Sequence, residues 1–218
     1  MIISFASTKG GVGKSTACAS IAAEIAIAGS RVLIMDLDHN QTLARWAKKS
    51  TIPRLDIEAV DRDAFTARFR EVVHAGSYDH VLIDLAGTRE ATVLKAIARS
   101  DLVIIPAQAS EPDLREALVV ITDIKDVEEE ARKPIAFRLL LTKMFPLRTR
   151  VTDFAHAEIH RHSIPRFRTT LVERAAYREM FLTGKAPSRN SKAGEEVAQL
   201  AGEVLALSHS TNKAKRSA

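Results

Sequence analysis

The chain has 218 residues, of which 46% are hydrophobic and 27% charged, and it contains one cysteine. This length suits one sizeable α/β domain and is too short for two. A single cysteine excludes an internal disulfide and a one-chain cysteine-ligated iron–sulfur cluster, and no apolar run approaches the roughly eighteen residues that span a bilayer. We therefore expect a soluble cytoplasmic protein, and the start at Met1 leaves no room for a secretory leader.

The net charge of +5 is unevenly distributed along the chain. Residues 1–130 carry 15 Lys and Arg against 20 Asp and Glu, whereas residues 131–218 carry 17 against 7. Such a basic concentration is expected of a surface that meets a phosphate backbone or an acidic partner. The alternative is a solvated basic face that has no partner.

Residues 9–16 read KGGVGKST and lie between an apolar run at 2–6, which predicts a strand, and a helical stretch at 15–28. This context is the one that a phosphate-binding loop needs, because glycines turn the backbone N–H groups inward at a helix N-terminus. Lys14 supplies charge to the phosphates and Ser15 a hydroxyl to Mg²⁺. An ordinary glycine-rich turn is the alternative. The predicted loop residues are Lys9, Gly10, Gly11, Val12, Gly13, Lys14, Ser15 and Thr16.

Lys9 stands before the Gly10-Gly11 pair and completes the pattern K-G-G-x-G-K-[ST], which ordinary phosphate-binding loops do not require. This pattern resembles the deviant Walker A motif of the ParA/MinD family of ATPases. In that family the first lysine reaches across a nucleotide-sandwich dimer to the partner's ATP. The resemblance implies that Lys9 acts in trans and that Lys9 and Lys14 are both catalytic. The alternative for Lys9 alone is a solvated surface lysine.

Residues 31–36 predict a buried strand that ends at Asp36, and LDHNQTL follows. This segment resembles the family's second motif, D-x-D-P-Q, with Asp36 and Asp38 in register. The resemblance implies that Asp38 positions or activates the attacking water and that Asp36 supports the Mg²⁺ shell. His39 and Asn40 depart from the usual proline and glutamine, which leaves the shape of the loop open. The alternative is an acidic turn that caps a helix at 42–49.

Residues 78–87 predict an apolar strand that ends at Asp84. The segment resembles Walker B, whose acidic residue holds Mg²⁺ through water. Gly87 would let the following loop approach the γ-phosphate and respond to it. A run of four apolar residues before an aspartate is weak evidence for this motif on its own. Its position after the two preceding motifs makes the evidence stronger.

The remaining pattern predicts an edge strand at 55–60, a helix from an Asp63 cap to residue 75, a strand at 100–106 and a helix of about twenty residues from Pro112. A further strand at 136–143 ends in Thr142 and Lys143, where relatives contact adenine. Beyond it we expect a helix at 153–162, a short strand at 164–167, and helices at 171–181 and 193–207. Trp46 is expected in the core or at an interface.

In the resembled family, ATP-bound dimers bind DNA without sequence preference through basic residues in this last part of the chain. The candidates here are Arg166, Arg168, Arg189 and Lys192. Few aromatic residues lie among them, so base stacking on single strands is less supported. His156 and His160 share a predicted helix face, but no cysteine or obvious third ligand completes a metal site, which favours a surface cluster.

The resemblance spans residues 2–207 and is strongest to short ParA proteins of plasmid partition. It implies an α/β doubly wound, mostly parallel sheet with helices on both faces, forming one ATPase domain at 1–207 before a disordered basic tail at 208–218. It further implies ATP and Mg²⁺, an ATP-dependent homodimer, non-specific DNA, a ParB-like stimulating partner and nucleoid association. Two alternatives share these motifs: a positioner of another cellular cargo, and a hydrolysis-deficient DNA-binding scaffold. A membrane-cycling protein is disfavoured, because the final eleven residues carry no apolar stripe.

Overall fold

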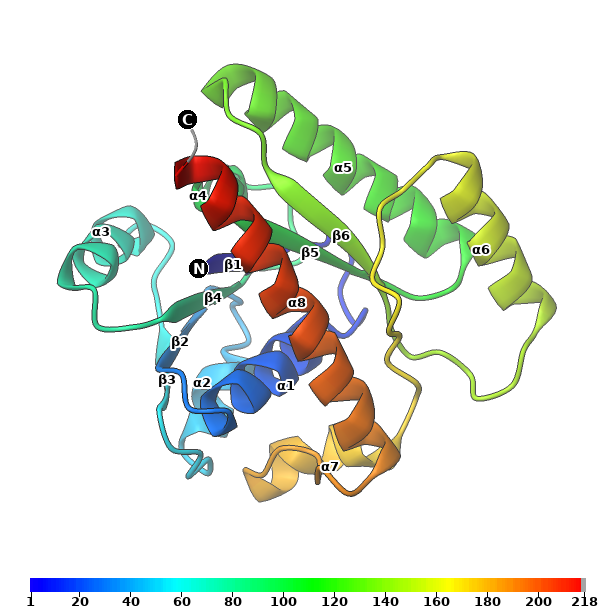
Figure 1. The fold of residues 1–218 in the computed structure, drawn as a ribbon, viewed down its shortest axis with the longest axis horizontal. Helices are drawn as coiled ribbons and strands as arrows, with labels where there is room; N and C mark the ends of the chain where they lie inside the picture. The colour runs from blue at the N-terminus through cyan, green and yellow to red at the C-terminus, as the bar shows by residue number, and fades with distance from the viewer. Residues whose placement is uncertain (217–218) are drawn as a thin grey trace.

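The computed structural model of this chain describes the backbone of residues 1–216 and the side chains of residues 1–207. Its centre is a six-stranded sheet in the order β3-β2-β4-β1-β5-β6, in which every neighbouring pair is parallel (Figure 1). The strands are β1 (Ile2–Phe5), β2 (Val32–Asp36), β3 (Leu55–Ala59), β4 (His80–Asp84), β5 (Leu102–Ala107) and β6 (Ala136–Leu141). The predicted fold class is confirmed, including the place of β3 at an edge of the sheet.

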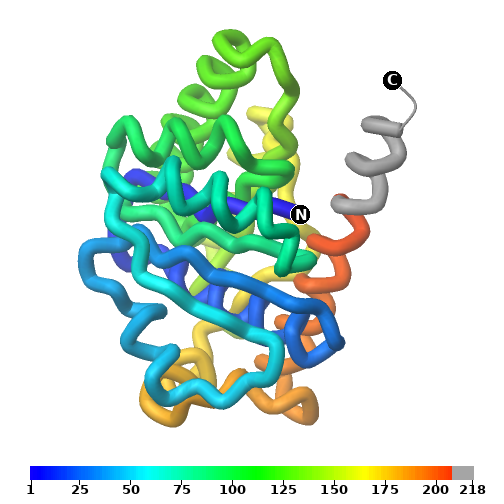
Figure 2. Tube along the Cα trace, turned by 90° about the vertical axis from the view of Figure 1, so that its left-hand side faces the viewer, coloured from blue at the N-terminus to red at the C-terminus, as the bar shows by residue number. Residues whose placement is uncertain are grey.

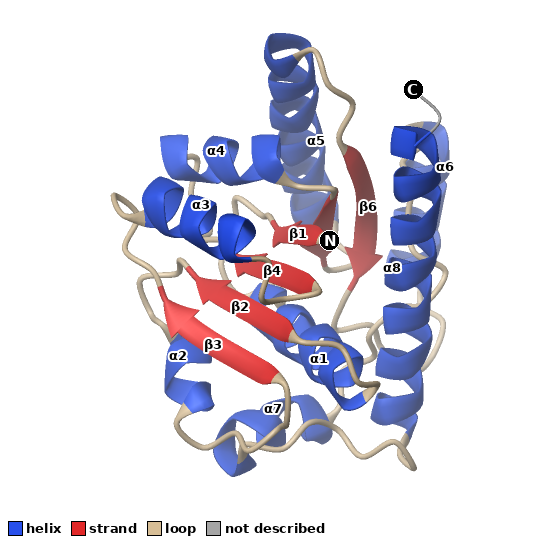
Figure 3. Ribbon diagram, turned by 60° about the vertical axis from the view of Figure 1, so that its left-hand side comes forward, coloured by secondary structure: helices blue, strands red, loops and turns tan. Residues whose placement is uncertain are grey.

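Helices cover both faces of the sheet, as Figure 3 shows. Apolar side chains of α3, α4, α5 and α6 pack in one core cluster, and those of α1, α2, α7 and α8 pack in the other. The helices span α1 (Lys14–Ile27), α2 (Thr42–Ala47), α3 (Phe65–Ala75), α4 (Ala91–Arg99), α5 (Glu111–Ala131), α6 (Arg150–Arg161), α7 (Ala175–Thr183) and α8 (Lys192–Arg216).

Strands β2 and β5 are buried along their whole length, because helices cover both faces of the sheet. In β2, Leu33 and Met35 face one core, while Val32 and Ile34 face the other. Trp46 is 1% exposed and donates its indole N–H to the carbonyl of Met180 at 2.8 Å, which confirms the expected core position. Cys18 is fully buried as well.

Three local expectations differ from the structure. Asp63 does not cap α3, because Ala64 takes the N-cap position and no side chain bonds there. The expected strand at 164–167 is only a single bridge from Arg166 to Leu139. Helix α7 starts at Ala175 rather than at 171, because Leu171 accepts an N–H from Met144 and donates its own to Leu141. The sequence pattern also gave no sign of α4.

The last helix also continues beyond the predicted end of the domain. Helix α8 runs to Arg216, so the backbone of residues 208–216 is helical rather than disordered. No glycine or proline follows Gly202 in this stretch, and nothing in the sequence therefore ends the helix at Leu207. Residues 217–218 lie outside the described residues. In the described part of the chain, no helix has both the length and the apolar character needed to span a membrane.

Candidate nucleotide-binding site

The carboxyl ends of three central strands bring the predicted acidic residues and the glycine-rich loop together. Asp36 and Asp84 are register partners on β2 and β4, and Phe5, at the end of β1, is the partner of Asp84 on its other side. The loop that follows β1 therefore begins beside both carboxylates. This edge is where parallel α/β sheets bind ligands.

The loop has the backbone conformation that its glycines predict. Gly11 and Gly13 adopt φ values of 76° and 90°, which side chains rarely tolerate, and Gly13 is the N-cap of α1. Lys14 is buried, and its ammonium donates to the carbonyl of Lys9 at 3.3 Å. Burial lowers the pKa of Lys14, while the charges of Asp84 and Asp38 oppose this shift. A buried cation at a helix N-terminus favours a polyanionic ligand.

Ser15 and Asp84 form the oxygen-rich end of this site. The Ser15 hydroxyl donates to Oδ2 of Asp84 at 2.6 Å. Burial raises the pKa of Asp84 to about 7, although the Ser15 bond opposes the shift. The other carboxylate oxygen, Oδ1, is buried and has no hydrogen-bond partner. Hydroxyl and carboxylate oxygens are the donors that Mg²⁺ prefers, so these two residues fit the predicted metal.

Asp36 uses its carboxylate to shape the backbone of the following loop. Oδ1 accepts the N–H of Asp38 at 3.1 Å, and Oδ2 accepts those of Leu43 and Ala44 at 2.9 and 3.0 Å. Asp36 thus bonds three backbone donors, two of them at the start of α2, and fixes where Asp38 lies. Its support of a metal shell stays a prediction.

Asp38 closes its own turn, although the usual proline is replaced by His39. Its Oδ1 accepts the N–H of Asn40 at 2.8 Å, and its carbonyl accepts that of Gln41 at 2.9 Å. Gln41 takes a left-handed conformation with φ of 46°. Asx-type bonding of this kind stabilises a tight turn without proline. The half-buried Asp38 therefore remains near Lys14, and its charge opposes the lowering of the Lys14 pKa by burial.

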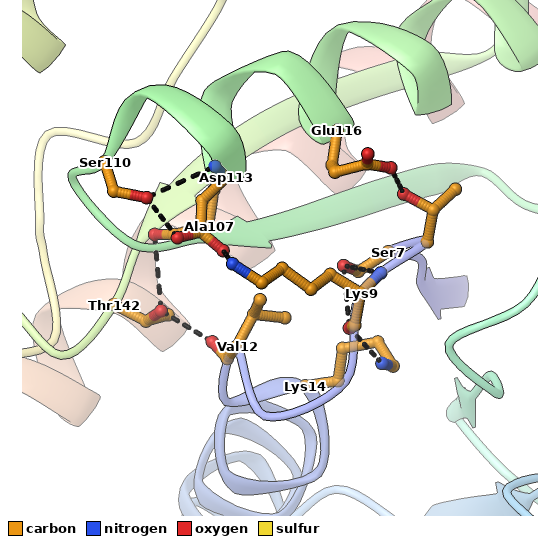
Figure 4. A network of polar contacts seen from close by, with 10 residues as sticks. Ser7, Lys9, Val12, Lys14, Ala107, Ser110, Asp113, Glu116 and Thr142 are labelled. Atoms are coloured by element: carbon orange, nitrogen blue, oxygen red, sulfur yellow. Dashed lines mark hydrogen bonds and ion pairs between the residues drawn. The ribbon is translucent and has the colours of Figure 1, made fainter.

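Lys9 points away from Lys14 and toward α5, as Figure 4 shows. Its ammonium lies 3.0 Å from Oδ1 of Asp113, a carboxylate that is 5% exposed. The Ser110 hydroxyl bonds the other oxygen of Asp113 and also accepts the Asp113 N–H at 3.2 Å, capping α5. Thr8 donates to Glu116 one turn further along the helix. The start of the loop is thus bound to α5 of the same chain.

The loop between β4 and α4 packs directly on the glycine-rich loop. A Cβ on Gly87 would lie 3.2 Å from the Lys9 carbonyl carbon and 3.3 Å from the Gly10 nitrogen, so a side chain there would force the two backbones apart. Ion pairs from Arg89 to Asp123 and from Arg62 to Glu90 hold the same loop. Gly87 thus lies against the phosphate-loop backbone, while its predicted response to the γ-phosphate stays a prediction.

A cavity of about 200 Å³ opens beside Gly13 and Thr16. Thr142 and Lys143 line it, and their contact with a base stays a prediction. Thr142 also donates to the Val12 carbonyl at 2.6 Å and so supports the loop from behind (Figure 4). Sequence reasoning missed the rest of the lining, which comes from Leu171, Val172, Glu173, Arg174, Tyr177, Arg178 and Phe181. The spacing of two aromatic residues by four on α7 was the only available signal.

The four predicted DNA-binding residues do not form one free basic face. Arg189 pairs with Glu24 at 2.7 Å, and Arg168 lies 3.9 Å from Glu203. Arg166 and Lys192 are exposed, and neither forms an ion pair with the described residues. Intramolecular pairing therefore neutralises part of the C-terminal charge that the composition suggests.

The histidines of α6 lie on the surface. His156, His160 and His162 are exposed. Across residues 1–207, whose side chains are described, no three His, Cys, Asp or Glu side chains gather as a metal site made by the protein alone would require. The Ser15–Asp84 pair differs from such a site, because ligand phosphates and water would complete it.

The sequence matches the family described as VirC1 protein over residues 1–196. The chain belongs to the VirC1 family. Among curated relatives, Protein ParA of Rhizobium radiobacter is 29% identical over 203 residues, which cover 91% of this chain and 90% of the relative. Maintenance of carboxysome distribution protein A of Gloeobacter kilaueensis is 26% identical over 84% of this chain and 82% of the relative.

Solved structures agree on the fold. McdA from Cyanothece without nucleotide superposes with a TM-score of 0.80 at 16% identity, covering 94% of this chain and 98% of that chain. The ATP complex of a McdA variant with one aspartate replaced by alanine gives a TM-score of 0.73 at 16% identity, covering 94% and 96%. The cell division ATPase MinD of Pyrococcus furiosus gives 0.74 at 18% identity, covering 94% and 98%. The family match and the ParA relative confirm the expected resemblance to the ParA/MinD family, whose members are P-loop ATPases.

Proposed function

We propose that this chain is a partition ATPase that binds ATP and Mg²⁺, forms a nucleotide-sandwich dimer, binds DNA non-specifically and segregates plasmid or chromosomal DNA. The observation that carries the proposal is the glycine-rich loop, in which the buried Lys14 lies near the Ser15–Asp84 pair and Lys9 extends toward α5. The ParA relative and the ATP complex of McdA support it.

The phosphates of ATP would lie over the N-terminus of α1. The N–H groups of the loop from Gly10 to Ser15 and the buried ammonium of Lys14 supply positive potential there. The base would enter the cavity beside Thr16, where Tyr177 and Phe181 offer aromatic surface. Mg²⁺, held by Ser15 and Asp84, would neutralise charge on the β- and γ-phosphates.

For hydrolysis, a water must attack the γ-phosphorus as the bond to the β–γ bridging oxygen breaks. Asp38 accepts a backbone N–H through one oxygen, and its carboxylate is placed beside the phosphate loop to orient that water. Lys14 stabilises the charge that develops on the transferred group. Lys9 supplies the second cation, which reaches the nucleotide of the opposite protomer.

The DNA-bound state would last as long as ATP is intact. The loops that contain Asp38 and Gly87 both approach the phosphates, so loss of the γ-phosphate removes a ligand that holds them in place. A ParB-like partner that accelerates hydrolysis would then release the dimer from DNA. The DNA-bound state lasts long enough only if ATP hydrolysis is slow in the absence of the partner. The proposed location is cytoplasmic and nucleoid-associated.

The test is binding of the purified protein to a duplex of arbitrary sequence with no nucleotide, ADP, ATP and a slowly hydrolysed ATP analogue. Each state is measured across a salt series, and dimerisation and phosphate release are followed in parallel. We expect DNA binding only with ATP or its analogue, together with dimerisation, and a steep loss of affinity with salt. ATP-dependent dimers that ignore DNA in every state would overturn the DNA-binding part.

Two other functions share the site and differ in a measurable way. A positioner of a different cargo is favoured by the relative named for carboxysome distribution, and it requires the same ATP and DNA steps with another partner. Partners that copurify with the ATP-bound dimer separate these two functions. A scaffold without hydrolysis would bind ATP and DNA but release no phosphate.

A further inference from the structure

Two stretches of the chain contain cations and no carboxylate. Residues 39–55 include Arg45, Lys48, Lys49 and Arg54, and residues 180–194 include Lys185, Arg189 and Lys192. The nearest acidic residues in the sequence, Asp38, Asp56, Glu179 and Glu195, lie just outside these stretches. The first stretch lies within residues 1–130, which carry a net negative charge, so the overall charge of that part does not reveal this basic segment.

The fold joins these two stretches at one end of the molecule. Trp46 of α2 donates to the carbonyl of Met180 at 2.8 Å, and the ammonium of Lys49 donates to that of Phe181 at 3.3 Å. Gly184 packs on the backbone of Lys49 so closely that a Cβ would lie 2.2 Å from its carbonyl oxygen. In Figure 2 the tube of α2 adjoins that of α7. This contact places Lys185 beside the end of α2.

We call Arg45, Lys48, Lys49 and Lys185 the α2–α7 basic surface. All four are exposed, and among the described residues none forms an ion pair with a carboxylate. The residues of α2 and Phe181 surround a shallow hollow of about 460 Å³ whose lining contains three cations and no acid. By contrast, Arg174, Arg178 and Arg189 are each paired with a glutamate.

We propose that the α2–α7 basic surface binds the phosphate backbone of duplex DNA. Unpaired cations on a helix and an adjoining loop provide the sequence-independent attraction that phosphate contacts require, since no intramolecular bond to an acid must break first. The lining contains no Asn, Gln, Asp or Glu side chain to read an adenine or cytosine edge, which fits positioning by phosphate contacts. This inference rests on the proposed DNA binding and locates it on residues that the sequence analysis did not select.

The test compares two triple variants that lose the same charge. Arg45→Gln, Lys48→Gln and Lys185→Gln remove three of the surface's cations and spare Lys49, whose ammonium bonds the Phe181 carbonyl. Lys95→Gln, Lys125→Gln and Lys133→Gln form the matched control, because these lysines are exposed on α4, on α5 and just after α5. Exposed substitutions of this kind change stability by about 0.5 kcal/mol or less, and melting curves check that both variants fold.

Binding of a duplex oligonucleotide is measured with the ATP analogue across a salt series. Fluorescence of Trp46, the single tryptophan, gives a second readout, because this buried residue borders the hollow. We expect the surface variant to bind about tenfold more weakly or worse, with a salt slope smaller by about 1–3, since each phosphate contact contributes about 0.9 to the slope. The control should match the wild type.

The possible outcomes distinguish failure of the proposed location from failure of the proposed DNA binding. If the surface variant keeps the affinity and salt slope of the wild type, DNA binding stands and this location is wrong. If the wild type binds no DNA in any nucleotide state, the proposed DNA binding fails and the inference fails with it. Vesicles of phosphatidylglycerol and phosphatidylcholine serve as a second probe. Charge-dependent binding to these vesicles without DNA binding would assign the surface to membranes and overturn the proposal.

Discussion

Lys9 and Asp113 form an ion pair within one chain, with 3.0 Å between Nζ and Oδ1. The carboxylate is buried and the ammonium is 44% exposed, so the lysine can leave while the aspartate stays in place. If Lys9 acts on the nucleotide of a second protomer, this pair must break when the dimer forms. The contact therefore opposes dimerisation.

Asp113→Asn should strengthen ATP-dependent dimerisation. Ion pairs of this partly exposed kind contribute up to about 1 kcal/mol, so we expect the dimer dissociation constant to fall by about two- to fivefold. The Ser110 cap of α5 is retained, because it uses the backbone N–H of Asp113. Sedimentation with the ATP analogue measures the effect. Glu111→Gln, which removes the exposed pair with Arg115 on the same helix, is the control. Equal dissociation constants for all three proteins would contradict this reading.

Lys9→Ala should abolish hydrolysis, or its stimulation by a partner, and leave some nucleotide binding. The buried Lys14 remains to neutralise the phosphates, whereas Lys9 lies on the side of α5 and bonds no other part of the loop through its ammonium. Phosphate release and binding of a fluorescent ATP analogue separate the two effects. Lys125→Ala, an exposed lysine of α5, is the control. Full turnover in the Lys9 variant would remove Lys9 from the catalytic set.

The glycine-rich loop and the strands next to it could be predicted from sequence, because their signals are local. A strand, a loop with glycines at positive φ and a helix follow one another within about thirty residues. The Asp36 and Asp84 positions follow from the same logic, since both end apolar strands. Parallel pairing then brings them to one edge without further information.

Contacts between distant segments could not be predicted in this way. The partner of Lys9 lies 104 positions later, after four further strands and the helices that connect them. Leu171 was predicted at the start of a helix, but it pairs with the end of β6 and lines the cavity beside Gly13. Likewise, the charge of Arg189 was counted as available, yet Glu24 of α1 pairs with it. Amino-acid composition counts charged residues but does not show which of them form ion pairs in the folded chain.

Asp84→Asn should stabilise the protein without nucleotide and abolish its response to ATP and Mg²⁺. The native carboxylate is buried, one of its oxygens has no hydrogen-bond partner, and burial raises its pKa to about 7. Asparagine avoids the free-energy cost of burying a charged carboxylate, and its amide oxygen still accepts a hydrogen bond from the Ser15 hydroxyl. We expect the melting temperature to rise by about 2–4 °C, which corresponds to ~1 kcal/mol in a chain of this size.

The same variant should show no increase in melting temperature when ATP and Mg²⁺ are added, because it lacks the anionic metal ligand. Differential scanning fluorimetry with and without EDTA measures both effects. Asp126→Asn, at an exposed position of α5, controls for loss of charge. A destabilised variant that still responds to ATP and Mg²⁺ would contradict the assignment of Asp84.

Gly184→Ala should destabilise the junction of α2 and α7. Gly184 ends α7 at φ of +77°, and an added Cβ would lie 2.2 Å from the Lys49 carbonyl oxygen. Gly76→Ala is the matched control, because Gly76 ends α3 at φ of +62° with nothing within 4 Å of the added atom. Because of backbone strain, we expect the free energy of unfolding to fall by about 1 kcal/mol in the control. At Gly184 the contact with Lys49 should add about 2 kcal/mol to this loss. Urea unfolding, followed by Trp46 fluorescence, measures the free energy of unfolding of both variants. Equal losses of stability would show that the backbone at Gly184 shifts to accommodate the added atom.

Glu203→Gln should reduce stability at neutral pH and have less effect in acid. The carboxylate accepts the N–H groups of Arg168 and Thr169 at 2.8 and 2.9 Å and the Thr169 hydroxyl at 2.6 Å. Burial alone would raise the pKa of Glu203, but these bonds outweigh it and hold the pKa below the usual 4.5. A lowered pKa means that the stabilisation is fully present above the unfolded value and is lost as pH falls through the folded one.

We therefore expect the Glu203 variant to be less stable than the wild type by about 1–2 kcal/mol at pH 7, because charged acceptors bond more strongly than amides. The difference should shrink as the pH falls from 4.5, the unfolded value, through the lower folded pKa, below which the wild-type carboxylate is protonated in both states. Glu179→Gln, at an exposed position of α7, provides the control. Melting temperatures between pH 7 and pH 3 measure the effect. A difference that does not change with pH would show that the Glu203 side chain stabilises this connection by packing rather than by its charge.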